Sequence, residues 1–310
     1  MHAIAPSLTP INPASIGGTP HEFVWHWNQQ AHTIVYETLG VYETSRQRTP
    51  VLLLPAFSTV STRSEMRGIA EQLAPQFQVW AMDWLGFGES DRPPLDYCPA
   101  VYYQLLHDFV RSQFDAPVAV IAAGHAAGYV MQLASVQPTV WSKIVLVAPT
   151  WRGPLPTMGA TQQIAGAVRQ TVRSPLLGQA LYKLNTVPSF LRLMYRRHVY
   201  TDADKLTPQF IQQKYQITQR PGARFAPAAF VTGALDPAQN RSDFLQNFQS
   251  LPTPLRLLIG EQAPPGSMAE MEAIAQLPNV QTDRLPGSLG LHEEYAAEVA
   301  AIARPFLQNE

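Results

Sequence analysis

The chain has 310 residues, of which 46% are apolar and 15% charged, and its net charge is −1. Folding a chain of this length buries roughly three quarters of its unfolded surface, so we expect one large domain with an insertion. Cys98 is the only cysteine, which excludes an intramolecular disulfide and a cysteine-based zinc site. No apolar run approaches the roughly 20 residues of a membrane-spanning helix, and residues 1–20 lack a secretory-signal pattern. We therefore expect a soluble, cytoplasmic protein.

The first half of the chain predicts strands that alternate with helices. Residues 1–20 are rich in Pro, Ser and Gly and predict a flexible N-terminal arm, and residues 23–27 and 33–37 predict a two-stranded ribbon. We then expect, in order, a strand over 51–54, a helix over 63–73, a strand over 77–82, a helix over 101–114, a strand over 118–123, a helix over 126–137 and a strand over 143–148. This alternation predicts a parallel sheet covered by helices.

The alternation stops after Pro149 and resumes near residue 251. Residues 151–250 predict a mostly helical insertion, interrupted by prolines. We then expect a strand over 255–259, a helix over 267–277, a strand over 280–285 and a closing helix over 293–307. The predicted fold class is therefore α/β, with a doubly wound, mostly parallel sheet built from residues 21–150 and 251–310. Residues 151–250 are predicted to form a helical lid on this core.

Positive charge is concentrated in the predicted lid. Residues 153–225 contain ten Lys or Arg against Asp202 and Asp204, which gives this stretch a net charge of +8. Leucines are interleaved with these cations, a mixture that suits an anionic membrane surface or an acidic partner. The interpretation that we favour from the sequence is a lid that buries its leucines on the core and leaves its cations solvated. Nucleic acid is not expected, because the rest of the chain is acidic.

Residues 83–93 form the most specific motif of the chain. They read Asp-Trp-Leu-Gly-Phe-Gly-Glu-Ser-Asp-Arg-Pro, and their spacing Asp-x-x-Gly-x-Gly-x-Ser resembles a strand-to-loop signature of the α/β-hydrolase superfamily. The resemblance covers residues 23–307 and points to the lidded branch of epoxide hydrolases, haloalkane dehalogenases and carbon–carbon bond hydrolases. The chain is also similar in general appearance to hydrolase-like proteins of cyanobacteria and plastids. The resemblance implies the α/β-hydrolase fold.

The three positions at which that family carries its reactive groups hold apolar residues here. Residues 124–128, Gly-His-Ala-Ala-Gly, match the nucleophile elbow Gly-x-Ser-x-Gly with Ala126 in place of the serine. By the family's spacing, the acid position is Ala263 and the base position, after a Pro-Gly turn, is Leu289. An alanine methyl group cannot attack a carbonyl carbon, so the resemblance implies a pseudoenzyme that binds a small, partly apolar ligand or a protein partner.

Three nearby side chains could restore catalysis. His292 lies three residues beyond the base position, Glu261 precedes the acid position, and Ser58 follows the third strand. The competing interpretations are a surface or helix-capping histidine for His292, a hydrogen bond to a backbone N–H for Glu261, and local turn bonding for Ser58. The alternative function is therefore a hydrolase or lyase with a nonstandard catalytic set. A second alternative is a peripheral membrane or scaffold protein that uses the basic lid.

Ligand contacts are expected at the carboxyl ends of the strands. The predicted ligand-binding residues are Phe57, Ser58, His125, Ala126, Ala127, Trp151 and Arg152. Backbone N–H groups of Phe57 and Ala127 would form an oxyanion hole. Trp151 and Arg152 could hold an anionic, aromatic ligand, and the competing interpretation is that Arg152 only anchors the lid to Asp or Glu side chains. The sequence contains no phosphate-binding loop, dinucleotide motif or metal-like cluster, so we expect no cofactor and no metal. The sequence leaves the ligand and the oligomeric state open.

Overall fold

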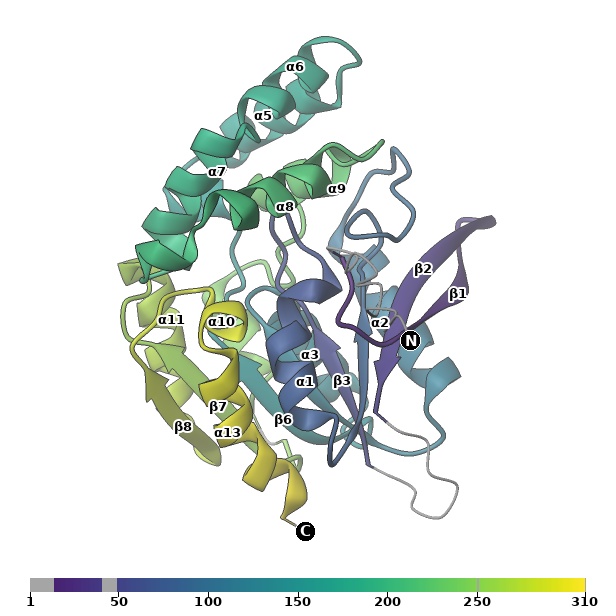
Figure 1. Cartoon of the computed structure of the whole chain (residues 1–310), viewed down its shortest axis with the longest axis vertical. Coiled ribbons are helices and arrows are strands. Elements are labelled where there is room, and N and C mark those ends of the chain that lie inside the picture. Colours follow the sequence, from purple (N-terminus) through teal and green to yellow (C-terminus); the bar gives the residue numbers. More distant parts are fainter. Residues whose placement is uncertain (1–13, 41–48, 250, 310) are drawn as a thin grey trace, which may run out of the picture.

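A mostly parallel sheet forms the centre of the molecule (Figure 1). The computed structural model describes residues 14–40, 49–249 and 251–309. Within this part of the chain the sheet has eight strands in the order β1-β2-β4-β3-β5-β6-β7-β8. The first two strands of that order pair antiparallel, β2 also pairs antiparallel with β4, and the neighbours from β4 to β8 are parallel. The predicted fold class is confirmed.

The predicted ribbon is a hairpin of β1 (Thr19–Trp27) and β2 (Gln30–Leu39). Asn28 and Gln29 connect the strands with φ of 48° and 65°. A two-residue turn with both φ values positive has the twist that an antiparallel pair needs, and asparagine tolerates this conformation better than most residues. The hairpin is longer than predicted because residues beyond its apolar centre also join the ladder.

The prediction of a flexible arm over residues 1–20 is wrong for residues 14–20. Ile16 is fully buried, and its backbone N–H donates to the Glu37 carboxylate at 2.8 Å. The Ser15 hydroxyl donates to the same carboxylate at 2.8 Å, and β1 begins at Thr19. Proline and glycine content indicated a loop but not the buried carboxylate that holds it. Residues 1–13 of the predicted arm lie outside the described residues.

All the parallel strands are short, and all except the edge strand β8 are mostly apolar because helices cover both of their faces. Their bounds are β3 (Pro50–Leu54), β4 (Gln78–Met82), β5 (Val118–Ala123), β6 (Trp141–Val147), β7 (Leu255–Gly260) and β8 (Val280–Leu285). Every residue of β5 is buried. In the centre of the sheet Ile121 pairs with Leu53 on one side and with Val145 on the other. Because these strands are parallel, the loops that follow their carboxyl ends lie at the same edge of the sheet.

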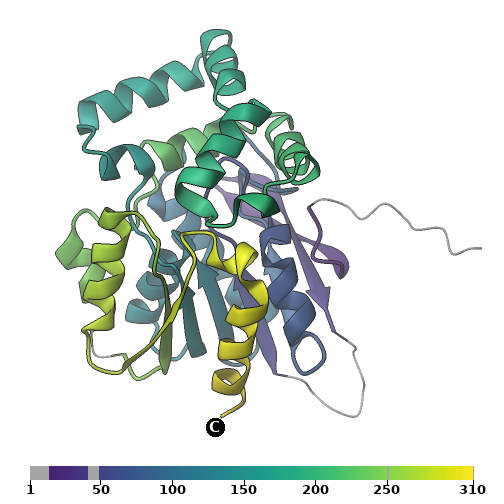
Figure 2. The same cartoon turned by 60° about the vertical axis from the view of Figure 1, so that its left-hand side comes forward.

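Two groups of helices cover the sheet. The helices of the core are α1 (Arg67–Leu73), which follows the 3₁₀ turn η1 (Arg63–Met66), α2 (Pro99–Gln113), α3 (Ala126–Val136), α11 (Pro265–Ala275), α12 (Leu291–Glu294) and α13 (Ala296–Gln308). Helix α1 packs beside α13 on one face, and α2 packs beside α3 on the other (Figure 2). The predicted closing helix is divided into α12 and α13.

A helical insertion separates β6 from β7 and lies above the sheet in both views (Figures 1 and 2). It consists of α4 (Pro154–Thr157), α5 (Gln162–Arg173), α6 (Leu177–Leu184), α7 (Pro188–Met194), the π-helical turn η2 (Tyr195–Val199), the 3₁₀ turn η3 (Ala203–Lys205), α8 (Pro208–Thr218), α9 (Phe225–Val231) and α10 (Arg241–Gln246). Pro154, Pro188 and Pro208 each occupy the first position of a helix, where the missing N–H is not needed.

The expectation that the insertion buries its leucines is wrong for its outer helices. The side chains of Leu176 and Leu184 are 88% and 67% exposed, and Leu177 is 57% exposed. Leu191 is buried, together with Tyr195 and other residues in a second, smaller apolar cluster. An amphipathic pattern predicts that a helix has an apolar face, but it does not predict what covers that face.

Candidate functional site

The backbone at the elbow is relaxed where an active enzyme holds its nucleophile under strain. Strand β5 ends at Ala123, Gly124 has φ of +50°, and α3 begins at Ala126. Ala126 is not among the described non-glycine residues with positive φ. A nucleophile elbow exposes its serine on a sharp, strained turn. Here only a glycine takes the left-handed conformation, and Ala126 is a fully buried helical residue.

Phe57 occupies the centre of an aromatic cluster beside the elbow. Its ring centroid lies 4.9 Å from Tyr102, 5.1 Å from Trp84 and 5.6 Å from Tyr129. Phe230, from α9 of the insertion, stacks at 6.3 Å. We call these five residues the aromatic cluster. Because Phe57, Trp84, Tyr102 and Tyr129 are buried, the cluster is part of the core rather than the wall of an open pocket.

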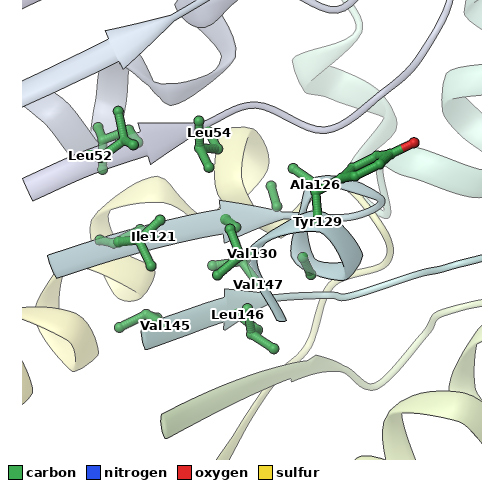
Figure 3. Close-up of a cluster of buried hydrophobic side chains, with 14 of the residues drawn as sticks. Leu52, Leu54, Ile121, Ala126, Tyr129, Val130, Val145, Leu146 and Val147 are labelled. Carbon is green, nitrogen blue, oxygen red and sulfur yellow. The ribbon is translucent and has the colours of Figure 1, made fainter. Parts of the chain in front are cut away.

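The predicted oxyanion hole is not preformed. The Ala127 N–H donates to the carbonyl of Gly124 at 3.3 Å, and the Thr150 N–H donates to the same carbonyl at 3.1 Å. An oxyanion hole requires N–H groups that are free to point at the reacting oxygen. One of the two predicted donors is therefore engaged within the turn itself. Figure 3 shows Ala126 and Tyr129 at the start of α3, just beyond the end of β5.

Residues 235–237 of the insertion close over the start of α3. The Leu235 carbonyl accepts the Tyr129 hydroxyl at 2.6 Å and His125 Nε2 at 2.8 Å. A Cβ atom at Gly128 would lie 2.3 Å from Cγ of Pro237, so the helix needs glycine there to accept this segment. The insertion thus contacts the elbow directly.

His125 is a packed, hydrogen-bonded histidine. A carbonyl oxygen can only accept, so the bond to Leu235 places a proton on Nε2. The ring meets those of Phe57 at 5.7 Å and Phe230 at 5.3 Å, both edge-on. Burial lowers the pKa of His125 to about 4, so the imidazole is neutral at neutral pH. Its Nδ1 has no hydrogen-bond partner among the described residues.

Asp236 is a residue of this site that the sequence did not single out. Its Oδ1 lies 3.6 Å from His125 Nε2 and accepts the Gly153 N–H at 2.8 Å. Burial raises the pKa of Asp236 to about 7, although the Gly153 N–H opposes the shift. The residue falls in an aperiodic, proline-rich part of the insertion, and no motif marks it. Its proximity to the elbow depends on how the insertion folds back.

Trp151, Arg152 and Ser58 do not join the aromatic cluster. Trp151 is buried and stacks on Phe244 at 5.7 Å. The exposed Arg152 guanidinium lies over the Trp151 ring at 5.6 Å and donates to the Pro156 carbonyl at 2.9 Å, at the end of the insertion's first helix. The Ser58 hydroxyl accepts the Val60 N–H at 3.1 Å, which is local turn bonding. The predicted ligand-binding set is therefore divided into separate groups.

The predicted acid and base positions lie on adjacent loops without a reactive group. Ala263 is buried and Leu289 packs against the main core. The Gln262 N–H donates to the Gly287 carbonyl at 2.9 Å, which joins the loops after β7 and β8. Glu261 is exposed, and its backbone N–H donates to Leu285 at 2.9 Å. The Glu261 carboxylate thus faces solvent rather than the elbow.

The interpretation of His292 as a surface histidine is wrong. It is 4% exposed, and its Nε2 lies 3.4 Å from Glu65. Lys214, from α8 of the insertion, lies 3.4 Å from Glu65 and 2.7 Å from Glu293. We call these four residues the insertion–core ion cluster. It joins η1 and α12 of the core to α8, and no described hydrogen bond or ring contact connects it to the elbow.

Two opposing effects, burial and charge pairing, shift the pKa values of Lys214 and Glu293 in this cluster. Burial alone would lower the pKa of Lys214, but Glu293 and Glu65 outweigh it and raise the pKa. Burial raises the pKa of Glu293, and Lys214 opposes this. Lys214 also lies over the Phe210 ring, 5.3 Å from its centroid. These contacts stabilise a charged lysine inside the protein.

The motif of residues 83–93 builds a buried ion network. The Asp83 carboxylate accepts the backbone N–H of Arg63 at 2.6 Å and that of Glu89 at 2.8 Å, and it pairs with the Arg63 guanidinium. The fully buried Arg63 also pairs with Glu37 and Glu89, each at 2.6 Å. A Cβ atom at Gly88, whose φ is +51°, would lie 2.0 Å from the Asp83 carboxylate. The motif thus orders its own loop.

Two open pockets lie away from the elbow. One, of about 460 Å³, lies between β1 and α2, and the other, of about 580 Å³, lies between Arg92 and Arg220. Among the described residues no group of three or more His, Cys, Asp or Glu could hold a metal ion. Within the same part of the chain, no helix combines the length and apolar character needed to cross a bilayer.

The chain belongs to the α/β hydrolase family. The model of the alpha/beta hydrolase family matches residues 51–302, from the third strand to the last helix. This confirms the superfamily that residues 83–93 indicated. The narrower resemblance to epoxide hydrolases and haloalkane dehalogenases stays a prediction.

Solved structures share the fold at low sequence identity. A thermophilic esterase from Thermogutta terrifontis is 18% identical with a TM-score of 0.71, over 94% of this chain and 98% of that one. An enol-lactonase from Burkholderia xenovorans is 14% identical with a TM-score of 0.68, over 90% and 97% of the two chains. At such identities these similarities show the fold alone.

Curated relatives match shorter stretches. An uncharacterized protein of Mycobacterium tuberculosis is 31% identical over 98 residues, which are 32% of this chain and 28% of that protein. A 2-hydroxy-6-oxo-6-(2'-aminophenyl)hexa-2,4-dienoic acid hydrolase of Metapseudomonas resinovorans is 31% identical over 83 residues, which are 26% and 29% of the two chains. The chain thus matches less than a third of the length of these relatives.

Proposed function

We propose that this protein is a catalytically inactive member of the α/β hydrolase family that acts by binding. The observation that carries the proposal is Ala126, fully buried and helical at the position of the nucleophile. Ala263 and Leu289 stand at the acid and base positions on the neighbouring loops. A pseudoenzyme is the function that this combination of an intact scaffold and missing reactive groups supports best.

The expected loss of activity is large. In triad enzymes, removing the nucleophile or the base lowers turnover by about 10⁶, and an oxyanion hole with substrate binding retains about 10³ to 10⁴ over water. Here the Ala127 N–H, one of the two oxyanion donors, is engaged by Gly124. The catalysis that an oxyanion hole could still supply without a triad is therefore expected to be reduced as well.

The bound species is proposed to be a small, partly apolar molecule or a protein partner. A small ligand at the elbow would have to displace Phe57 or Phe230, because their rings and residues 235–237 occupy that place. A partner that binds the outer surface meets no such obstacle. We therefore favour recognition outside the elbow. Location in the cytoplasm remains part of this proposal.

Turnover assays test the proposal. Wild-type protein and the Ala126→Ser variant are assayed on a panel of esters, thioesters and epoxides. We expect background rates for both, because a serine at residue 126 would face Leu289 and Ala263 at the base and acid positions instead of a histidine and a carboxylate. Substrate turnover by the wild type that is lost when an elbow residue is changed would refute the proposal.

A second candidate function is a hydrolase or lyase with a nonstandard catalytic set. The observation that favours it is the His125–Asp236 pair, separated by 3.6 Å, whose pKa values shift to about 4 and about 7. A carboxyl group with a pKa near neutrality can exchange protons at working pH. This candidate predicts a lactone or ester turnover that Asp236→Asn and His125→Gln both abolish. Unchanged rates in both variants would exclude it.

A further inference from the structure

Most of the large apolar side chains that are exposed in the described chain belong to the outer helices of the insertion and the turns between them. They are Met158, Ile164, Val168, Leu176, Leu177, Leu184, Val187 and Leu193. Within the described chain the other exposed large apolar residues are Val24 and Val136, which lie apart on β1 and α3. We call residues 158–193 the insertion tip. Helices α5 and α6 of this tip lie farthest from the sheet at one end of the molecule (Figure 1).

Helix α5 has one side on the core and the other in solvent. Arg169 and Arg173 reach the core loop and donate to the carbonyls of Tyr97 at 2.8 Å and Leu95 at 2.6 Å. Ile164 and Val168, also four residues apart, are 55% and 37% exposed. The core thus covers the basic stripe, and the apolar stripe is left uncovered, which is the reverse of the usual surface helix.

Every charged side chain of the insertion tip itself is basic, and Asp96 of the core pairs with Arg169 and Arg173 on the core-facing side of α5. No Asp or Glu occurs between Asp115 and Asp202. Lys183, on α6, is exposed, and so are Arg192, Arg196 and Arg197 on and after α7. Exposed leucines on helices that also carry exposed cations match an anionic surface with an apolar interior.

We propose that the insertion tip binds anionic lipid bilayers, with Leu176 and Leu177 entering the boundary between headgroups and acyl chains. The cations of α6, α7 and the following turn η2 would meet lipid phosphates, since long basic side chains extend toward headgroups while their stems stay apolar. A second copy of the chain fits less well, because a symmetric contact would bring the same cations face to face. This inference goes beyond the proposed function and does not depend on the elbow.

Vesicle sedimentation with the full chain tests the proposal. We expect the protein to pellet with phosphatidylcholine vesicles that contain about 30% phosphatidylglycerol and to stay in solution with phosphatidylcholine alone. Raising the salt from about 0.05 to about 0.5 M should weaken binding, because exposed charges are screened. The double variant Leu176→Ser/Leu177→Ser should bind at least about tenfold more weakly, because two leucines no longer leave water.

Two further variants separate the contributions of the apolar tip and of its cations to vesicle binding. Val136→Ser, at an exposed apolar position on α3, should bind like the wild type. Arg192→Gln/Arg196→Gln/Arg197→Gln should lose the preference for anionic vesicles. Circular dichroism and the melting temperature verify that each variant is folded.

Three results would overturn the proposal. The first is that the protein does not bind anionic vesicles at low salt, and the second is that the double leucine variant binds them as well as the wild type does. The third is that light scattering detects self-association of the wild type, which the double leucine variant abolishes, and that neither protein binds vesicles. The last result would assign the tip to a second copy of the chain. Hydrolytic activity would contradict the proposed function but would leave the membrane result untouched.

Discussion

At the scale of single residues, the elbow holds two titratable groups that burial shifts in opposite ways. Burial favours the neutral form of each, so the pKa of Asp236 rises to about 7 and that of His125 falls to about 4. Their effects on stability therefore have opposite dependences on pH. Each can be measured with a variant that preserves its hydrogen bond.

Asp236→Asn should stabilise the protein above pH 7. The folded state takes up its proton near pH 7 and the unfolded chain near 3.8, so the wild type loses stability from this group as the pH rises between those values. An asparagine oxygen can still accept the Gly153 N–H. We expect the free energy of unfolding at pH 8 to rise by about 2 kcal/mol in urea titrations. Equal or lower stability of the variant at pH 8 would contradict the shift.

His125→Gln should protect the protein against acid. Between pH 6.5 and 4 the unfolded chain protonates its histidine and the folded protein does not, so wild-type stability falls as the pH falls through this range. A glutamine amide can donate to Leu235 without titrating. The measurement is the difference in unfolding free energy between pH 7 and 5, which should shrink by roughly 2 kcal/mol. An unchanged difference would show that the imidazole is not buried as described.

At the scale of elements, the insertion–core ion cluster connects α8 to the core. Lys214→Met should lower the free energy of unfolding by about 3 kcal/mol, because Glu65 and Glu293 would lose their buried cation. Lys183→Met, at an exposed position on α6, is the matched control and should change stability by less than about 0.5 kcal/mol. Thermal or urea unfolding measures both. Equal effects of the two substitutions would exclude a stabilising role for the cluster.

The strands were the elements best predicted from the sequence. The bounds of β5 and β8 agree with the predicted residues 118–123 and 280–285. Strand β5 was readily found because strands covered on both faces are short, continuous apolar runs between turn residues. The helices of the insertion were expected, but their exposed faces were not. Their amphipathic patterns are the same whether core or solvent lies on the apolar side.

The environment of the site residues could not be predicted, because it depends on contacts between distant segments. The contact between His292 and Glu65 spans 227 residues, and that between His125 and Leu235 spans 110. A motif fixes the position of Ala126 in the chain, but not the aromatic rings that the fold packs beside it. The motif thus predicts where the elbow lies in the chain, and the structure adds which side chains pack around it.

At the scale of the whole molecule, ion pairs and hydrogen bonds hold the insertion to the core at several places. Lys214 meets Glu65 and Glu293, Arg220 pairs with Glu89 at 2.9 Å, and residues 235–237 cover the elbow. Within the insertion tip, Arg169 and Arg173 of α5 also bond to the core, and the exposed apolar side chains lie outside these contacts. The fold therefore combines an elbow that is packed with side chains with an exposed basic and apolar surface.

The central claim is that the hydrolase scaffold retains no nucleophile able to react. Intact-mass spectrometry of the wild-type protein after incubation with an excess of a fluorophosphonate probe tests it most directly. We predict an unmodified mass for the wild type and for Ala126→Ser, since Ala263 and Leu289 stand at the acid and base positions in both. A stoichiometric adduct on the wild-type protein, mapped by peptide sequencing to a side chain near the elbow, would contradict the claim.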